Sequence, residues 1–352
     1  MNEQGGQRTR RITLRDVASR AGVSLKTASN VVNGSGRMSA ATRKRVQEVI
    51  DQSGYKVNAA ARNLNRNKTG FITLAVPSLT PPYLSELANR VIDSARLKGY
   101  AVYVSTYAEG SAKGARDLLR SFNNTISDGI ILSMSELEDF TTSDLDVSYP
   151  LVCVGARDTR GVADHVMVDD RASAAMAADY LFARQVRSLA VVGLHQRLDE
   201  GRLGSAREGN AELRMRGILE ASRRRGVEID RRLMGVTGYD WSLGRGYLTM
   251  QSIIDSGVGF DGVVALNDQL AIGALSALTA NDIDVPGQVQ LIGFDNIEES
   301  AYLQTPLTTM DSRLEWISRT SVNRILSRIG QAGQEARTLV SESRVIARNT
   351  TR

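Results

Sequence analysis

The chain has 352 residues, with 44 Lys and Arg, 39 Asp and Glu, two His and one Cys. At about 100–200 residues per domain, this length predicts two or three domains. A single Cys excludes a disulfide framework, the two His have no metal-ligand spacing, and no run of about 18 apolar residues suits a membrane span. The polar first residues lack the apolar region of a signal peptide. We therefore expect a cytoplasmic globular protein that uses neither a metal nor a cofactor.

The charge is unevenly distributed along the chain. Residues 1–70 contain 14 Lys and Arg and four acidic residues, a net charge of +10, whereas the remainder carries −5. Such an asymmetry predicts a polyanion-binding module joined to a larger body. A solvated basic tail is the alternative, but residues 12–57 are patterned as helices.

Three helices are predicted in the basic segment. Thr13 followed by Asp16 resembles a capping box, and Gly22 can take the positive φ that ends the first helix. Ser24 caps a second short helix that runs to about residue 32, and Ser39 caps a third. Two short helices joined by a tight turn, with a third packed behind them, make a helix-turn-helix.

The second helix of such a unit reads base edges in the major groove of DNA. Lys26 can donate to guanine, Asn30 can pair with adenine, and Leu25 can contact a thymine methyl group. Phosphate contacts, which give affinity and register, are expected from the helix ends and from residues 43–45. A three-helix domain without DNA affinity is the alternative. The predicted DNA-binding residues of the head are Thr13, Ser24, Leu25, Lys26, Thr27, Ser29, Asn30 and Asn33.

Residues 12–34 closely resemble the DNA-binding head of the lactose/galactose-repressor (LacI) family of transcription regulators. Residues 38–46, MSAATRKRV, are similar to the family's third-helix pattern. Three positions depart from the family: Met38 replaces the usual valine, Val57 stands where many members have Pro, and Asn30 stands where many have Arg.

Residues 54–64 resemble the hinge segment of the same family. The resemblance implies a hinge helix and linker over residues 58–70, capped by Asn58, that folds on the operator. Leu64 would then act as an apolar wedge that opens a minor-groove step. Packing of Leu64 within a permanently folded linker is the alternative.

From residue 71 onward, strand-like apolar runs alternate with helical runs. This alternation predicts parallel sheets covered on both faces, and the body is long enough for two α/β lobes. The expected strands are 71–76, 100–106, 129–133, 151–154, 165–168, 189–192, 262–266 and 289–294. The expected helices are 82–98, 172–184, 211–225 and 268–280.

We find no motif of an enzyme in the body. It lacks the Gly-Lys-Ser/Thr of a phosphate loop, a Gly-x-Ser-x-Gly elbow and a His-Glu-x-x-His helix. Asp169 and Asp170 are adjacent, so on a strand their side chains point apart, which favours a cap role over a catalytic pair. An α/β enzyme, or a sugar-binding transport protein with an unrelated head, is the alternative class.

The family resemblance continues over the body, for example at 266–268, 292–296 and 305–309. It implies two lobes of the type I periplasmic-binding-protein kind, with the chain crossing between them near 170, 310 and 330. The predicted domains follow. The head spans 12–57, lobe 1 spans about 71–170 and 311–328, and lobe 2 spans about 171–310 and 329–352.

The resemblance also implies an effector cleft at the carboxyl ends of the strands. Arg214 matches the family's effector-binding arginine, Asn267 and Asp295 match its polar strand-end ligands, and Trp241 matches an aromatic that stacks on ligand rings. We expect Arg157 and Tyr83 to face the same cleft. The alternatives are a surface charge for Arg214, helix or strand-end caps for Asn267 and Asp295, core packing for Trp241, a surface ion pair for Arg157 and inter-lobe packing for Tyr83.

Together these patterns predict a sequence-specific transcriptional regulator, a repressor by resemblance, that works in the cytoplasm at the nucleoid. Its expected partners are a pseudo-palindromic operator in double-stranded DNA, a second copy of the chain paired through the helix at 82–98, and a small-molecule effector. Arg, Asn, Asp and Trp side chains fit a sugar. A regulator of the same fold controlled by a protein partner or a nucleobase-type corepressor is the alternative.

Overall fold

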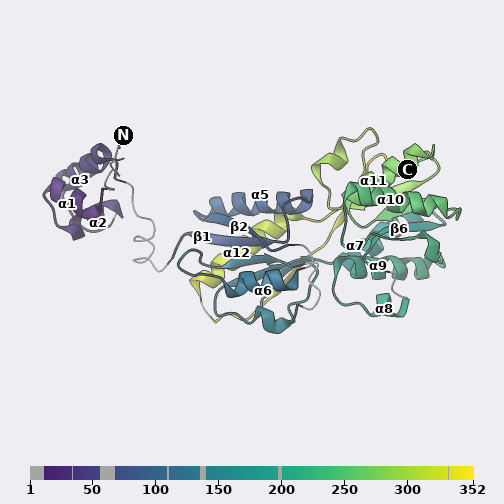
Figure 1. Cartoon of the computed structure of the whole chain (residues 1–352), viewed down its shortest axis with the longest axis horizontal. Coiled ribbons are helices and arrows are strands. Elements are labelled where there is room, and N and C mark those ends of the chain that lie inside the picture. Colours follow the sequence, from purple (N-terminus) through teal and green to yellow (C-terminus); the bar gives the residue numbers. More distant parts are fainter. Residues whose placement is uncertain are drawn as a thin grey trace, which may run out of the picture. The chain divides into compact units, whose positions relative to one another are not determined.

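The structure is a computed structural model that describes residues 12–33, 35–55, 68–108, 111–134, 140–196, 200–331 and 333–352. The chain forms two compact units, residues 1–69 and 70–352 (Figure 1). Asn58 and Leu64 of the predicted hinge lie outside the described residues, so the hinge helix stays a prediction. In the described part of the chain, no helix is long and apolar enough to cross a membrane.

The first unit contains the three predicted helices, α1 (Leu14–Ala21), α2 (Leu25–Val32) and α3 (Ala40–Ser53). The capping box is confirmed, because the Thr13 hydroxyl and amide both donate to Asp16 and the Asp16 amide donates back to Thr13. Gly22 has a φ of 61° and ends α1 as predicted. The N-caps of α2 and α3 are confirmed too, since each serine accepts the amide three residues on, Ser24 from Thr27 and Ser39 from Thr42.

A small apolar core holds the three helices together. Val17 of α1, Ala28 of α2 and Val46 of α3 are fully buried, and Val31 of α2 packs in the same cluster. These positions are the inward stripes of the helices, so the outward faces stay available for a partner.

In its described residues, the second unit contains two six-stranded sheets. The order of the first sheet is β11-β5-β4-β3-β1-β2, with all neighbouring strands parallel. The order of the second is β12-β10-β9-β8-β6-β7, parallel except for β12 against β10. The strands of the first sheet are β1 (Phe71–Val76), β2 (Ala101–Thr106), β3 (Ile130–Ser133), β4 (Leu151–Val154), β5 (Asp164–Val168) and β11 (Thr338–Ser341). Those of the second are β6 (Leu189–Leu194), β7 (Met234–Val236), β8 (Gly262–Ala265), β9 (Gln290–Phe294), β10 (Thr308–Asp311) and β12 (Arg344–Ile346).

Helices cover both faces of each sheet, as the buried apolar strands require. In lobe 1, α5 (Pro82–Arg96) and α12 (Leu314–Gly330) share one core, and α6 (Ala112–Arg120) packs in another. In lobe 2, α7 (Asp170–Phe182) and α9 (Asn210–Arg225) lie on one face, and α10 (Leu243–Asp255) and α11 (Asp268–Ala280) lie on the opposite face (Figure 1). The short α8 (Glu200–Ser205) precedes α9.

The third crossing between the lobes differs from the prediction. The first two crossings fall between β5 and α7 and between β10 and α12, but the third lies between β11 and β12, not near residue 330. Thr338 of β11 is paired with His165 of β5, so the residues after α12 complete the first sheet. The family resemblance implied that residues 329–341 belong to lobe 2, and this partly exposed edge strand, TLVS, has no clear apolar pattern that would have indicated otherwise.

Candidate effector cavity and nucleic-acid interface

A cavity of about 390 Å³ lies between the two lobes, within the range of about 300–1,000 Å³ typical of small-molecule sites. It sits at the carboxyl ends of the parallel strands, as expected for open α/β sheets. Pro77, Ser133 and Gly155 line it from lobe 1, at the ends of β1, β3 and β4. The structure brings five of the six predicted effector residues to this cavity: Tyr83, Arg214, Trp241, Asn267 and Asp295.

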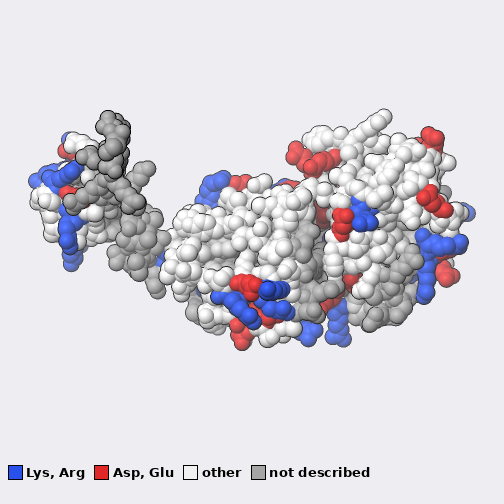
Figure 2. Space-filling view, in the orientation of Figure 1, with Lys and Arg blue, Asp and Glu red and all other residues white. Residues whose placement is uncertain are grey.

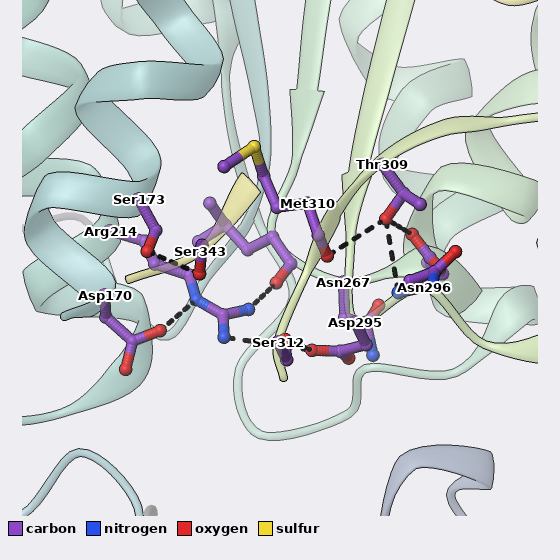
Figure 3. A network of polar contacts seen from close by, with 12 residues as sticks. Asp170, Ser173, Arg214, Asn267, Asp295, Asn296, Thr309, Met310, Ser312 and Ser343 are labelled. Atoms are coloured by element: carbon purple, nitrogen blue, oxygen red, sulfur yellow. Dashed lines mark hydrogen bonds and ion pairs between the residues drawn. The ribbon is translucent and has the colours of Figure 1, made fainter. Parts of the chain in front are cut away.

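Arg214 is the centre of a buried polar network (Figure 3). Its Nε donates to Asp170 Oδ1 at 2.7 Å, its Nη1 donates to the Leu266 carbonyl, and its Nη2 lies 3.9 Å from Asp295 Oδ1. The guanidinium also lies over the Phe294 ring, with Cζ 4.5 Å from the ring centroid. The alternative of a solvated surface charge is therefore wrong.

Burial and charge act against each other in this network. Burial favours the neutral form of Arg214, but Asp170 and Asp295 outweigh it and raise the pKa of the guanidinium. Burial raises the pKa of Asp295, although Arg214 and a hydrogen bond from Ser312 at 3.0 Å oppose the rise. Asp295 also has a φ of 104°, a strained conformation for a residue with a Cβ. Such strain is often found at ligand sites.

Asn267 has a structural role and also faces the cavity. Its Oδ1 accepts the Leu270 amide at 2.8 Å and so caps α11, as the alternative reading expected. Its Nδ2 donates to the Trp241 carbonyl at 3.2 Å, which ties the Trp241 loop to the end of β8. Trp241 lines the cavity and packs against the cores on both faces of the second sheet.

Three aromatic rings form one wall of the cavity in lobe 2. His195 has its ring centroid 5.6 Å from that of Trp241 and 4.6 Å from that of Tyr239. Glu212 orients the imidazole, with Oε1 3.2 Å from Nδ1. Burial raises the pKa of Glu212, but the hydrogen bond and charge of His195, together with Arg157, lower it below its usual value. This wall offers ring faces to a flat or C–H-rich ligand surface.

Tyr83 faces the network from α5 of lobe 1. Burial raises the pKa of its hydroxyl strongly, and the charges of Asp295 and Asp170 raise it further. The phenol therefore stays protonated and offers one donor and one acceptor to the cavity.

The prediction that Arg157 reaches this cavity is wrong. Its Nη1 donates to Glu208 Oε1 at 3.2 Å, and it lines a second cavity of about 280 Å³ together with Arg160 and Phe140. The turn after β4 directs the Arg157 side chain toward the second cavity and away from the central one. Its position at the end of a strand did not predict this direction.

Asp170, His195 and Tyr239 are among the residues of the central cavity that sequence reasoning missed. Asp170, assigned to a cap, is buried in the ion pair with Arg214, while its neighbour Asp169 caps α7 by accepting the Ala172 amide at 2.9 Å. His195 and Tyr239 were not selected, although each directly follows a strand or turn at the carboxyl edge of the second sheet. Their position at that edge was the sequence signal from which a place in the cavity could have been predicted.

The head presents the N-terminus of α2 to solvent. Ser24, Leu25 and Lys26 are exposed, and Leu25, an apolar residue, is 47% exposed. Lys and Arg side chains gather over this unit, with few acidic ones (Figure 2). An exposed apolar and cationic helix end suits contact with base edges and phosphates.

Other predicted DNA contacts have partners within the head. Asn33 Nδ2 donates to Ser29 Oγ at 3.2 Å, and Thr27 shares a hydroxyl hydrogen bond with Ser24 at 2.8 Å. Asn30 packs so closely on Gly36 that a Cβ there would lie 2.5 Å from the Asn30 amide nitrogen. Asn30 therefore supports the loop after α2 in this structure.

Two family models match the chain. Residues 13–58 match "Bacterial regulatory proteins, lacI family", and residues 178–351 match the "Periplasmic binding protein-like domain". The first corresponds to the helical head, and the second to most of lobe 2 together with α12 and β11 of lobe 1.

Relatives cover nearly the whole chain. The ribose operon repressor of Haemophilus influenzae is 25% identical, over 96% of this chain and 98% of its own length. The repressor PurR of Erwinia tasmaniensis is 28% identical, over 93% of each chain. The crystal structure of a LacI-type transcription regulator from Bifidobacterium animalis subsp. lactis is 30% identical, with a TM-score of 0.76, and the match covers 80% of this chain and 99% of that one.

The fold and the two sites thus define a DNA-binding transcriptional regulator with a separate effector domain. The chain belongs to the LacI family of bacterial transcriptional regulators.

Proposed function

We propose that this chain is a homodimeric repressor that binds a pseudo-palindromic operator at the nucleoid and is controlled by a sugar in the central cavity. The observation that carries the proposal is the buried Asp170–Arg214–Asp295 network beneath an aromatic wall, in a chain that also carries an exposed recognition helix.

The DNA half of the proposal rests on α2. Lys26 donates to guanine in the major groove, Leu25 contacts a thymine methyl group, and the α2 N-terminus with Ser24 meets a phosphate. The exposed Arg43, Lys44 and Arg45 of α3 add phosphate contacts that set affinity and register. In this proposal Asn58 caps the hinge helix, and Leu64 opens the minor-groove step.

The effector half rests on the chemistry of the cavity. Carboxylate oxygens of Asp170 and Asp295 accept hydroxyl hydrogens, while Arg214 and the Tyr83 hydroxyl donate to ring or hydroxyl oxygens. The rings of Trp241 and Tyr239 offer faces to the C–H surface of a sugar. Acceptors, donors and an aromatic face together are what a polyol ring requires.

Dimerisation follows from the way such heads read DNA. Two heads related by a two-fold axis bind two half-sites, so the operator repeats the symmetry of the protein. We place the contact at α5 of lobe 1, next to which Leu97 is 87% exposed.

Ligand binding between two lobes can change their relative arrangement, and the lobes are joined by three crossings next to the Arg214 network. A ligand that prefers one arrangement changes operator affinity by its differential binding energy. Coupling of about 1–3 kcal/mol gives a roughly 5–150-fold change in operator affinity.

Footprinting with the purified protein tests the proposal. DNA fragments from around its own gene are protected in the presence of competitor DNA at two salt concentrations, and neutral sugars are then added singly. A two-fold symmetric, salt-sensitive footprint that one sugar changes supports the proposal. A footprint that responds only to nucleobases, or only to an added protein, contradicts the sugar assignment.

A further inference from the structure

Arg214 is the one Lys or Arg among the described residues that line the cavity, and its charge is already neutralised. Its Nε is held by Asp170 at 2.7 Å, and Asp295 lies 3.9 Å from its Nη2 (Figure 3). Both carboxylates are as deeply buried as the arginine, with side-chain exposures of 9%, 10% and 8%. Charges this close are weakly screened by water or salt, so an incoming ligand meets the whole cluster and not a free guanidinium.

The charge balance of the cavity follows from its lining. Among the described lining residues, Asp170, Asp240 and Asp295 stand against Arg214, with His195 as the remaining titratable base. The carboxylate of Asp170, 2.7 Å from Arg214 Nε, by itself balances the charge of the guanidinium. The negative charge of Glu86 on α5 adds to the field at Asp295 and Tyr83. A phosphate or carboxylate would therefore enter a site without net positive charge, and like-charge contact in a buried site is strongly unfavourable.

An uncharged hydroxyl-rich ligand has no such cost. The O–H groups of the ligand donate hydrogen bonds to Asp170 and Asp295. The oxygens of the ligand accept hydrogen bonds from those N–H groups of Arg214 that do not already bond to the protein. The wall of Trp241, His195 and Tyr239 leads from this cluster to the partly exposed rim, where Tyr239 is 40% exposed. The ligand thus keeps its polar edge at the buried end and its C–H face on the rings.

We propose that the effector cavity selects an uncharged, hydroxyl-rich ligand and rejects the phosphorylated form of the same sugar, with Asp170 as the residue that sets this selectivity. The inference rests on the proposed function, since it specifies the chemical class of sugar that the regulator senses. It assigns to Asp170 a role that its neighbour Asp169, which caps α7, does not share.

The test measures binding of inorganic phosphate and glucose 6-phosphate to the full chain by isothermal titration calorimetry. Wild-type protein is expected to show no saturable binding of either anion at millimolar concentration. Asp170→Asn removes the charge that neutralises Arg214, so this variant should bind both anions at least about tenfold more tightly than wild type. Asp240→Asn is the matched control. It also removes one carboxylate from the lining, but at the exposed rim, where Arg245 pairs with it at 3.4 Å, so it should gain no anion binding.

Tight anion binding by wild type would overturn the proposal, and so would an equal gain in the Asp170→Asn and Asp240→Asn variants. A folded Asp170→Asn variant that gains nothing would show that Asp170 does not set the selectivity. If this variant fails to fold, Asp170→Ser replaces it, since it also removes the charge beside Arg214, and failure of that variant to gain anion binding also counts against the proposal. Titration of wild type with a panel of neutral sugars distinguishes failure of the proposed function from failure of this inference. If no neutral sugar binds, the proposed sugar response is wrong, whereas the comparison of anion binding still decides whether Asp170 sets the selectivity.

Discussion

Arg157 of lobe 1 donates to Glu208 of lobe 2 across 3.2 Å, so an ion pair joins the two lobes beside the effector cavity. The side chain of Arg157 is 16% exposed and that of Glu208 is 38% exposed. Solvent partly screens an ion pair at this depth. The interaction energy of the pair also depends on the distance between the two lobes.

We expect a measurable coupling between these two side chains. In a double-mutant cycle with Arg157→Ala and Glu208→Ala, the coupling free energy of unfolding should be about 0.5–1 kcal/mol. Urea denaturation of the four proteins measures it. The Arg171–Glu220 pair lies within lobe 2 and serves as the comparison. Effector binding should strengthen the coupling of the cross-lobe pair alone, and an equal change in both pairs would contradict a role in lobe closure.

Arg214→Ala should affect both stability and the effector response. The substitution leaves Asp170 and Asp295 buried without their cation, so the free energy of unfolding should fall by about 3–5 kcal/mol. Operator binding by the folded fraction should persist, because α2 belongs to a separate compact unit. Thermal unfolding together with an electrophoretic mobility shift separates the two effects. An equal loss of DNA binding in folded protein would mean that Arg214 is not a ligand contact.

Asp164 should confer a stability that is lost in acid. It is fully buried and accepts hydrogen bonds from Arg324 at 2.8 Å, from Arg328 and from the Arg337 amide. Burial raises the pKa of Asp164, but these donors outweigh it and lower the pKa below the ordinary 3.8. The stabilisation is therefore complete above pH 3.8 and is lost as the pH falls through the lower folded value.

Asp164→Asn tests this expectation. At neutral pH the free energy of unfolding of the variant should be about 3 kcal/mol lower than that of wild type, because two arginines lose their buried counter-ion. Urea denaturation from about pH 7 down to about pH 3 should show the difference from wild type shrinking only at the acid end. A difference that is constant with pH would contradict the charge argument.

Lys26 and Lys44 should respond differently to substitution. Lys26→Ala removes a base contact, so it should cost about 1–3 kcal/mol on the preferred operator and relax the choice of base at one position in each half-site. Lys44→Ala removes a phosphate contact, so it should weaken binding to all sequences and reduce the salt slope by about 1. Binding to a randomised operator library at several salt concentrations distinguishes them. An unchanged base preference in Lys26→Ala would exclude this residue from the readout.

The helix ends of the head could be predicted from the sequence because local chemistry determines them. The Thr13–Asp16 box, the Gly22 stop and the Ser24 cap each need contacts within three or four residues. The same holds for α11, which the structure places at Asp268–Ala280 as predicted, with Asn267 as its cap.

The missed elements depend on distant residues. The short strands β7 and β11 form because β6 and β5 offer free edges, not because their own sequences require it. The role of Asp170 could not be read from its neighbours either, since it depends on Arg214, which lies 44 positions later in the chain. Arg157 was wrongly included in the central cavity, because its position at the end of a strand was taken as evidence that its side chain points into that cavity.

The late position of the third crossing affects the order in which the lobes are completed during synthesis. Lobe 1 begins at β1, yet its sheet and core need β11 and α12. Nearly all of lobe 2 is therefore synthesised before the last pieces of lobe 1 emerge from the ribosome. The head needs only residues close together in sequence, so it can fold much earlier, because domains made first tend to fold first. A nascent chain could thus acquire its DNA-reading surface before it has a finished cavity with which to sense a ligand.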